Sequence, residues 1–278
     1  MKYRIEKNTV QETLVIPLYG RKVCTELFPN LYRDETAAKL IEQIDYDFSC
    51  LEAQSKKAMY RFGYLEVAMR QNDLAAEIKD YLKDHPNAAV VNLGCGLDDT
   101  GRKCDNGTCK IYNLDFPNVI DVRNELLPAG DREENVACDL NDTSWFEKID
   151  ASGGAVFFAS GVFYYFFTEQ VKTLVCEMAK AFPGGKLVFD AANKKAGKLL
   201  RKTWLKVAKI KNVGSYFAVS KAKKELSPWS EKIEVSSRGY MLGYNDLKDP
   251  SVSKLFRLMA KLGDGFMKMQ IVRIDFKK

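Results

Sequence analysis

A short turn built around two glycines is the part of the chain whose residue types most directly suggest ligand chemistry. Gly94, Cys95 and Gly96 follow an apolar run and precede a predicted helix, as in the first half of a dinucleotide-binding turn. The third glycine of that pattern is replaced by Asp99, which stands beside Asp98. Two carboxylates at a helix start repel a phosphate and occupy the positive end of the helix dipole. The turn therefore disfavours NAD and FAD, and it favours an uncharged or cationic nucleoside.

Polar residues at the ends of the following predicted strands complete a nucleoside site. Asp115 lies about 20 residues after the turn, the spacing of an acid that accepts hydrogen bonds from ribose hydroxyls. Asp139 ends the third predicted strand, within reach of an adenine amino group, and Leu140 offers the ring an apolar face. Ser160 ends the fourth strand, between cofactor and acceptor. A ribose, no phosphate and a positive charge near carboxylates describe S-adenosylmethionine, although each acid alone is also typical of a turn.

Alternating strands and helices must position these residues. Short apolar runs alternate with helical segments, which is the signature of a parallel α/β sheet. The runs are at 88–93, 110–115, 135–140, 154–160 and 185–191. Two further runs near the C-terminus predict closing strands, antiparallel to the others. We therefore expect an α/β fold with a doubly wound, Rossmann-like, seven-stranded and mostly parallel sheet.

The first third of the chain has a different pattern, in which apolar residues recur at helical spacing. From Met59 to Leu74 they recur on successive turns of one predicted helix, and an earlier helix begins with an aspartate cap. This pattern predicts an N-terminal helical lid and substrate layer over 1–85. The sheet domain is then expected over 86–278.

Histidine and cysteine usage disfavours several kinds of chemistry. The only histidine, His85, precedes the first parallel strand, whereas active sites of open α/β sheets lie at the opposite, carboxyl edge. A histidine base, a serine or cysteine triad and most metal hydrolases are therefore disfavoured. Cys95, Cys104 and Cys109 lack a CxxC pair and a nearby histidine, so no metal site is expected. Seven cysteines scattered through apolar segments predict free thiols in a reducing compartment.

The positive charge is concentrated in one segment. Residues 194–211 carry eight Lys and Arg side chains and no acidic one, so the rest of the chain is slightly acidic despite a formal net charge of +6. Leu200, Trp204 and Val207 recur there at helical spacing, which favours one packed face and solvated lysines over a nucleic-acid or membrane surface. No apolar run has membrane-spanning length and no secretion signal is evident. We therefore expect a cytoplasmic protein that binds no nucleic acid.

Six pieces of the sequence together resemble the leucine carboxyl methyltransferase family, and more closely its bacterial branch of O-methyltransferases of polyketide biosynthesis. The pieces are IPLYGR, RFGYLE, VVNLGCGLDDT, YNLDFPNVI, CDL and SGVFYYF. The LGCGLD string followed by LDFP is specific to the family, and the others support it in combination. The resemblance extends from about residue 13 to residue 192. It implies that the sheet domain is a class I S-adenosylmethionine-dependent methyltransferase domain.

The resemblance also implies roles for individual residues. It repeats the cofactor contacts given above and adds Arg61, from the helical layer, as the ligand of the methionyl carboxylate, a contact that arginine can make with two hydrogen bonds. Arg21 matches a family arginine near the substrate side, and Tyr165 matches a tyrosine after the fourth strand. Beside these two, Tyr164 and Tyr19 are candidates for the acceptor pocket and its lid.

Two positions depart from the family's pattern. Glu66 stands where the family usually has aspartate, and Ser160 stands where many members have glutamate. Methyl transfer from a sulfonium mainly requires alignment of the reacting atoms, which suits a chain without an available histidine base. We expect an O-methyltransferase of a small-molecule carboxylate or phenol, with no catalytic side chain. The sequence does not predict the oligomeric state. An NAD(P)-dependent oxidoreductase and a non-catalytic S-adenosylmethionine-binding protein are the alternatives.

Overall fold

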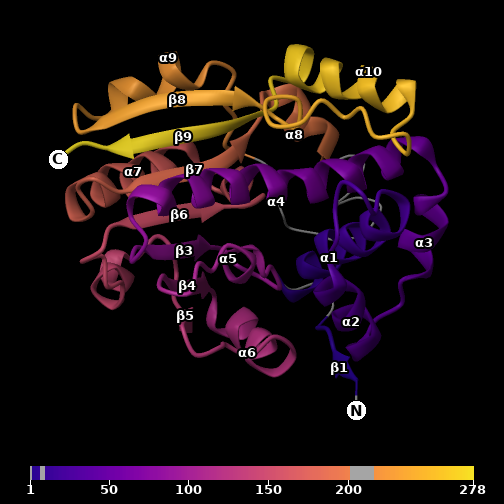
Figure 1. Cartoon of the computed structure of the whole chain (residues 1–278), viewed down its shortest axis with the longest axis horizontal. Helices are drawn as coiled ribbons and strands as arrows, with labels where there is room; N and C mark the ends of the chain where they lie inside the picture. Colours follow the sequence, from indigo (N-terminus) through magenta and orange to yellow (C-terminus); the bar gives the residue numbers. More distant parts are fainter. Residues whose placement is uncertain (1, 7–9, 201–215) are drawn as a thin grey trace.

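The computed structural model describes residues 2–6, 10–200 and 216–278, and a helical layer lies at one end of a large sheet (Figure 1). The elements of this layer are β1 (Tyr3–Arg4), α1 (Val10–Leu27), α2 (Glu35–Gln43), β2 (Ile44–Asp45), α3 (Ser49–Ser55) and α4 (Ala58–Asp84). The aspartate cap of α2 is confirmed, because the Asp34 carboxylate accepts a hydrogen bond from the Ala37 amide at 2.8 Å.

The large sheet has seven strands in the order β5-β4-β3-β6-β7-β9-β8. Their bounds are β3 (Ala89–Leu93), β4 (Lys110–Asp115), β5 (Glu133–Ala137), β6 (Ala155–Ala159), β7 (Lys186–Ala191), β8 (Ile233–Gly239) and β9 (Gln270–Phe276). Strands β3 to β7 are parallel, and β9 pairs antiparallel with β7 and β8. The predicted doubly wound sheet and its antiparallel closing strands are confirmed. The strand order reverses at β3 and β6, and ligands of such sheets bind at the carboxyl ends beside that point.

Helices cover both faces of the sheet. Alternate residues of each strand point to opposite sides, and apolar side chains on both sides need to be buried. In β3, Val91 belongs to the core that includes α7 (Thr168–Ala181), whereas Val90 belongs to the core that includes α4. The other described helices are α5 (Thr100–Lys103), α6 (Pro117–Leu126), η1 (Thr143–Lys148), η2 (Phe163–Tyr165), α8 (Lys194–Leu200), α9 (Ala222–Leu226), η4 (Ser227–Trp229), α10 (Lys254–Leu262) and the π-helix η5 (Gly263–Met267).

Helix α4 connects the helical layer to the sheet. Its first turns contact α1 and α3, and its later turns lie along β6 and β7 (Figure 1). It ends just before β3 begins, so it runs against the direction of the parallel strands, and its middle crosses their carboxyl edge. One side of this middle therefore faces any ligand bound there. The division into a lid over 1–85 and a sheet domain over 86–278 stays a prediction.

One predicted element is displaced and another lies partly outside the described residues. The sequence pattern predicts the third parallel strand at 135–140, but this strand ends at Ala137, which pairs with Asp115 at the end of β4. The chain then leaves the sheet, because β4 offers no further partner. Of the basic stretch 194–211, the part from residue 201 onward lies outside the described residues. No described helix is long and apolar enough to cross a membrane.

Asp73 of α4 makes the stability of the fold depend on pH. Its carboxylate is fully buried and accepts a hydrogen bond from the Met241 amide at 2.8 Å, and burial raises its pKa from 3.8 to about 8. The folded protein keeps a proton that the unfolded chain has released, so stability falls as the pH rises from about 4 to about 8. In Asp73→Asn, which cannot ionise, we expect the free energy of unfolding in urea to fall less over this range. The exposed Glu134→Gln should keep the wild-type pH dependence, and the same slope in both variants would contradict the prediction.

Candidate active site

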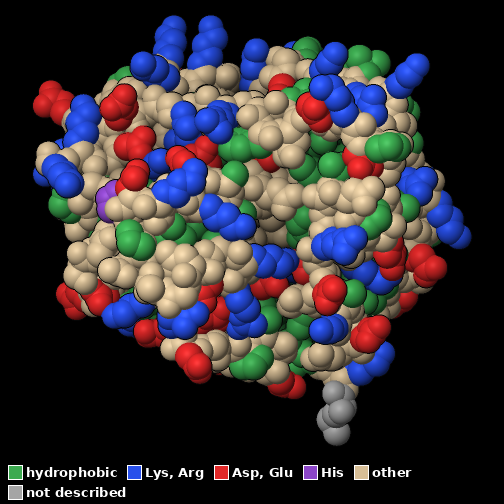
Figure 2. Space-filling model, in the orientation of Figure 1, with side chains coloured by type: hydrophobic (Ala, Val, Ile, Leu, Met, Phe, Trp, Pro, Cys, Tyr) green, Lys and Arg blue, Asp and Glu red, His purple; other side chains and the backbone are tan. Residues whose placement is uncertain are grey.

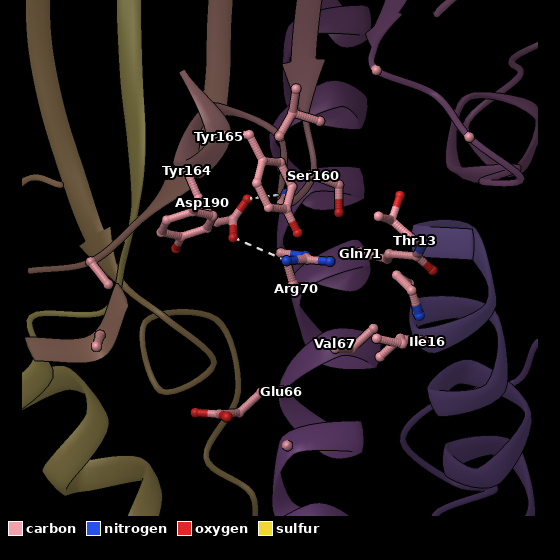
Figure 3. Close-up of a pocket in the computed structure, with 18 of the residues that line it drawn as sticks. Thr13, Ile16, Glu66, Val67, Arg70, Gln71, Ser160, Tyr164, Tyr165 and Asp190 are labelled. Carbon is pink, nitrogen blue, oxygen red and sulfur yellow. Dashed lines mark hydrogen bonds and ion pairs between the residues drawn. The ribbon is translucent and has the colours of Figure 1, made fainter. Parts of the chain in front are cut away.

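A cavity of about 750 Å³ lies at the carboxyl ends of β3, β4, β6 and β7, and residues of α1 and α4 form part of its wall (Figure 3). This is the edge at which the sheet topology places a ligand. Most of the site residues predicted from the sequence line the cavity: Arg21, Gly94, Cys95, Gly96, Asp115, Leu140, Ser160, Tyr164 and Tyr165. The structure thus brings together the glycine turn, the strand-end residues and the two tyrosines.

The glycine turn needs both of its glycines for shape and for space. Gly94 and Gly96 have φ angles of +67° and +47°, in the left-handed region that other residues rarely adopt. A Cβ atom on Gly94 would lie 2.7 Å from Cγ2 of Val162, and one on Gly96 would lie 2.9 Å from Cδ2 of Leu14. The turn therefore brings bare backbone to the cavity while α1 and the loop after β6 close around it.

Gly94→Ala should destabilise the protein more than an alanine substitution at a glycine where backbone strain is the only cost. Gly107 also has a positive φ, of +90°, but an added Cβ would meet nothing within 4 Å. We expect Gly107→Ala to cost about 1–2 kcal/mol of unfolding free energy and Gly94→Ala about 2–4 kcal/mol, because only the second also displaces Val162. Urea unfolding measures both values, and equal losses would show that the close contact at Gly94 is relieved at no cost.

Asp115 is joined to the glycine turn by its carboxylate. One oxygen accepts a hydrogen bond from the Gly96 amide at 2.8 Å, and the other accepts one from the Phe116 amide at 2.8 Å. Burial raises the pKa of this carboxyl, and the two amides oppose that rise. Each oxygen retains a further lone pair for a ligand. Phe116, Cys138 and Leu140 also line the cavity and give it apolar surface near the ends of β4 and β5.

Asp98 is the carboxylate after the turn that faces the cavity. Its Oδ1 accepts hydrogen bonds from the Gln71 side chain at 3.0 Å and from the Thr100 amide at 2.8 Å. Its Oδ2 is buried and has no hydrogen-bond partner within the described ranges. A buried oxygen of this kind is costly to leave unpaired. Arg21 lies 3.8 Å from the other oxygen, Oδ1, so Oδ2 is the atom that would attract a further cationic group. This arrangement agrees with the sequence argument against a phosphate at the turn.

Arg21 lies in the cavity wall, but protein groups hold most of its guanidinium. It is buried, it donates to the Asp34 carboxylate at 3.1 Å and to the Leu97 carbonyl at 2.7 Å, and it lies 3.7 Å from Asp99. Asp99 also pairs with Lys103 at 2.8 Å. Arg21 therefore fastens α1 to the turn. Only its Nε lacks a hydrogen-bond partner in the part of the chain described, so the predicted contact with an acceptor depends on that atom.

Three predicted residues lie away from the cavity. Tyr19 and Arg61 line a separate surface depression, where Tyr19 stacks on Phe48 with ring centroids 5.7 Å apart. Asp139 is exposed and accepts hydrogen bonds from the amide and side chain of Asn141, because the chain has already left the sheet at that point. The structure therefore does not bring these three side chains to the other predicted residues.

On α4, Arg70 lines the cavity and Arg61 does not. The two residues are nine positions apart on α4, about two and a half turns, so they point to opposite sides of the helix. Nη1 of Arg70 donates to the Asp190 carboxylate at 3.1 Å, and an added Cβ on Gly161 would lie 2.6 Å from the same atom. Nε of Arg70 and Oγ of Ser160 are both buried without a hydrogen-bond partner among the residues described (Figure 3). These unsatisfied atoms leave room for a polar ligand group.

Sequence reasoning misses Arg70 and Asp190, although signals for both exist. Asp190 lies near the end of the fifth parallel strand, so the strand-end rule that selects Asp115 also selects it. Its carboxylate accepts a hydrogen bond from the Gly161 amide at 2.6 Å in addition to the contact with Arg70. Arg70 lies on the same helical stripe as Gly63 and Glu66, which also line the cavity, whereas Arg61 lies off that stripe.

Beyond the strand ends, the cavity continues as an apolar chamber between α4, α8, α10 and η5. Its walls are mainly thioether, aliphatic and aromatic side chains: Met59, Phe62, Leu199, Tyr216, Met259, Leu262, Phe266, Met267 and Met269. Tyr164 and Tyr165 lie on the Asp190 side of Arg70 (Figure 3). Burial and the neighbouring Asp190 carboxylate raise the pKa of Tyr164 well above its ordinary value, so its hydroxyl stays protonated at neutral pH.

The single histidine lies at the other edge of the sheet. His85 follows the last turn of α4 and stacks on Tyr81 with ring centroids 4.3 Å apart, beside the start of β3. This position confirms the expectation that it is remote from the ligand edge. In the described ranges, no group of three or more His, Cys, Asp or Glu side chains is arranged to hold a metal ion.

Comparisons with known proteins find a matching family and proteins that share the fold. The family model described as leucine carboxyl methyltransferase matches residues 20–179. The tetracenomycin polyketide synthesis O-methyltransferase TcmP of Streptomyces glaucescens is 27% identical over 183 residues, which are 66% of this chain and 66% of that protein. A candidate methyltransferase from Thermobifida fusca superposes with a TM-score of 0.61 at 14% identity, over 87% of this chain and 93% of the other. A duf574 family protein from Streptomyces avermitilis superposes with a TM-score of 0.59 at 10% identity, over 93% of this chain and 97% of the other. Such distant likenesses show the fold alone.

Proposed function

This chain belongs to the leucine carboxyl methyltransferase family of S-adenosylmethionine-dependent enzymes, and on that premise we propose that it methylates an oxygen of a small molecule, a carboxylate or a phenol. The observation that carries the proposal is a single cavity in which a glycine turn and strand-end carboxylates adjoin an apolar chamber. A volume of about 750 Å³ is in the upper part of the range for small-molecule sites, so there is room for cofactor and acceptor together.

The cofactor fits the unsatisfied groups of the cavity. Asp115 would accept hydrogen bonds from the ribose hydroxyls, and Phe116 and Leu140 would enclose the adenine. Arg70 would bind the methionyl carboxylate through the donors that Asp190 leaves free, in place of the Arg61 expected from the sequence. The predicted adenine contact of Asp139 would need its exposed carboxylate to turn away from Asn141.

The chemistry asks little of the protein beyond alignment. When bound, S-adenosylmethionine supplies an electrophilic methyl group, which an acceptor oxygen takes with one of its electron pairs as the carbon–sulfur bond breaks and the sulfur becomes a neutral thioether. A carboxylate acceptor needs no proton removed, whereas a phenol must lose one. Four described carboxyl groups line the cavity: Glu66, Asp98, Asp115 and Asp190. Amides or Arg70 occupy Asp115 and Asp190. Asp98 lies at the glycine turn with the Gln71 and Thr100 donors. Burial raises the pKa of Glu66 to about 8, so it is protonated at neutral pH. His85 lies outside the cavity. This distribution favours the carboxylate.

The surface and the cysteines support a cytoplasmic enzyme of small molecules. Lys and Arg side chains alternate with Asp and Glu on the face shown in Figure 2, without the single-sign field that nucleic acids require. All seven cysteines are free thiols, as in proteins of reducing compartments.

Calorimetric titration with S-adenosylhomocysteine, with NAD and NADP in parallel, tests the cofactor first. We expect micromolar binding of S-adenosylhomocysteine alone, followed by transfer of labelled methyl from S-adenosylmethionine to members of a carboxylate and phenol panel. Binding of NAD instead would overturn the cofactor assignment. Binding of S-adenosylhomocysteine with no transfer to any member of the panel would favour a non-catalytic binding protein.

A further inference from the structure

Glu66 is the one acidic side chain of α4 that lines the apolar chamber. It makes no hydrogen bond or ion pair with any residue that the structure describes, and Figure 3 shows its carboxyl group extending from α4 away from α1. A Cβ atom on Gly263 would lie 4.0 Å from its Oε1 and 3.2 Å from Sδ of Met269, so the acid extends toward η5 and the methionines of the chamber. The residue is partly buried, and its carboxyl oxygens are not among the fully buried atoms of the described chain that lack a partner. An apolar ligand that fills the chamber would take water from this group, so a ligand with a polar atom placed to hydrogen bond to it is favoured.

Glu66 lies one helical turn from Arg70, the residue that we expect to bind the cofactor. It precedes Arg70 by four residues, one turn of α4, so the two side chains are about 6 Å apart along the helix axis and on the same side. Arg70 marks the cofactor end of the cavity, and Glu66 lies farther into the chamber. A molecule whose reacting oxygen lies near Arg70 and Tyr165 must therefore extend past Glu66 to fill the chamber.

The charged and titratable groups around Glu66 favour its neutral form. Burial raises its pKa from 4.5 to about 8, Asp264 of η5 adds to the rise, and Arg70 opposes it. The hydroxyl groups of Tyr164 and Tyr240 also face it, and both have pKa values raised by burial. The Tyr240 hydroxyl donates to the Glu66 carbonyl at 2.7 Å and so does not pair with the carboxyl group. At neutral pH, Glu66 is thus a carboxylic acid that can donate one hydrogen bond and accept others.

Resting on the proposed function, we propose that Glu66 selects the acceptor by hydrogen bonding to a second, uncharged oxygen, a carbonyl or hydroxyl on an apolar ring system, remote from the oxygen that is methylated. The apolar walls suit the ring system, and Glu66 is the only carboxyl group of the described chamber wall that is free to meet its oxygen. A second anion would face Asp264 as well as Glu66. An ammonium group would meet Glu66 in its neutral form, and a charged group of either sign would lose its hydration in the chamber.

Binding of matched naphthoates to the protein saturated with S-adenosylhomocysteine tests this proposal by calorimetry. The probes are 2-naphthoate, 6-hydroxy-2-naphthoate, 6-acetyl-2-naphthoate and 2,6-naphthalenedicarboxylate. We expect the hydroxy and acetyl compounds to bind about 3- to 10-fold more tightly than 2-naphthoate, the effect of one neutral hydrogen bond, and the dicarboxylate to bind less tightly. Above about pH 8, ionised Glu66 can only accept, so the preference for the acetyl compound should disappear while that for the hydroxy compound remains.

Two substitutions separate hydrogen bonding from shape. Glu66→Leu should remove the preference for both substituted compounds, and Glu66→Gln, which can still donate and accept, should restore most of it. Asp80→Asn, an exposed change on the same helix, should behave as the wild type. All variants should bind S-adenosylhomocysteine with unchanged affinity. Because the preference is a ratio within each variant, a partial loss of folded protein does not alter it.

The results separate this proposal from the proposed function. Failure to bind S-adenosylhomocysteine would contradict the proposed function. If S-adenosylhomocysteine binds normally, three results would overturn only the role of Glu66. They are equal affinity for substituted and plain naphthoate, no binding of any naphthoate, and an unchanged preference in Glu66→Leu.

Discussion

Arg70→Ala should abolish the protein's preference for S-adenosylhomocysteine over its decarboxylated analogue. Nη1 of Arg70 is held by Asp190, and its Nε is buried without a hydrogen-bond partner in the described chain, so the guanidinium has a donor left for a carboxylate. A charge-assisted hydrogen bond of this kind contributes about 1.5–3 kcal/mol, which corresponds to about 10- to 150-fold in affinity. Calorimetry with the two ligands measures the preference directly, and the wild type should show it in full.

Arg61→Ala is the matched control on the same helix. Its side chain lies in the depression with Tyr19, outside the main cavity, so we expect less than about a twofold change in affinity for either ligand. A lost preference in Arg61→Ala together with a normal one in Arg70→Ala would reverse our assignment. It would restore the role that the family resemblance gives to Arg61, and it would require α4 to turn or the lid to close when the cofactor binds.

The substitution of Arg70 also leaves a buried carboxylate without its cation, and this could unfold the protein. Asp190 would retain its hydrogen bond from the Gly161 amide at 2.6 Å but would lose its cation, and breaking a buried pair costs about 3–5 kcal/mol. The double variant Arg70→Met, Asp190→Asn removes both charges and keeps an acceptor for that amide. It should fold and should show the same loss of preference, so instability alone cannot produce the result.

The contrast between Arg61 and Arg70 shows what sequence reasoning could and could not reach in this protein. The sheet and the glycine turn were predictable because they depend on local patterns, the alternation of apolar runs with helices and the spacing from Gly94 to Asp115. The arginine that lines the cavity was not predictable, because a motif match fixes a position along the chain but not the side of the helix that faces the ligand. Only the packing of α4 on α1 and on the sheet determines that side.

Arg21 and Asp139 illustrate two further physical reasons. The partners of Arg21 come from the loop before α2 and from the cofactor turn, and such long-range ion pairs leave no periodic signal in the sequence. Asp139 follows a strand whose end depends on where its neighbour β4 ends, so apolar pattern alone extends the strand past Ala137. Strand ends predict cavity-lining residues well where the strand is inside the sheet, as at Asp115 and Ser160, and less well at the sheet edge.

Asp115→Ala should weaken binding of S-adenosylhomocysteine by about 1–3 kcal/mol, or about 5- to 150-fold. The carboxylate lines the cavity at the end of a central strand and is held in place by the Gly96 and Phe116 amides, so it is already oriented for two ribose hydroxyls. Removing it takes away the acceptors for the ribose and also leaves both amides without their partner. The loss should therefore appear in the affinity for adenosine as well, because the contact is with the nucleoside and not with the amino-acid end.

Asp139→Ala is the control that gives the Asp115 result its meaning. Both residues are aspartates at strand ends in the sequence, but Asp139 is exposed and bound to Asn141, outside the cavity wall. We expect Asp139→Ala to bind S-adenosylhomocysteine as the wild type does, because its carboxylate is exposed and held by Asn141 rather than by the cavity wall. A comparable loss in both variants would mean that the loop after β5 moves onto the adenine when the cofactor binds. Unchanged affinity in a folded Asp115→Ala would instead remove the ribose contact, and with it the reason for placing a nucleoside at this turn.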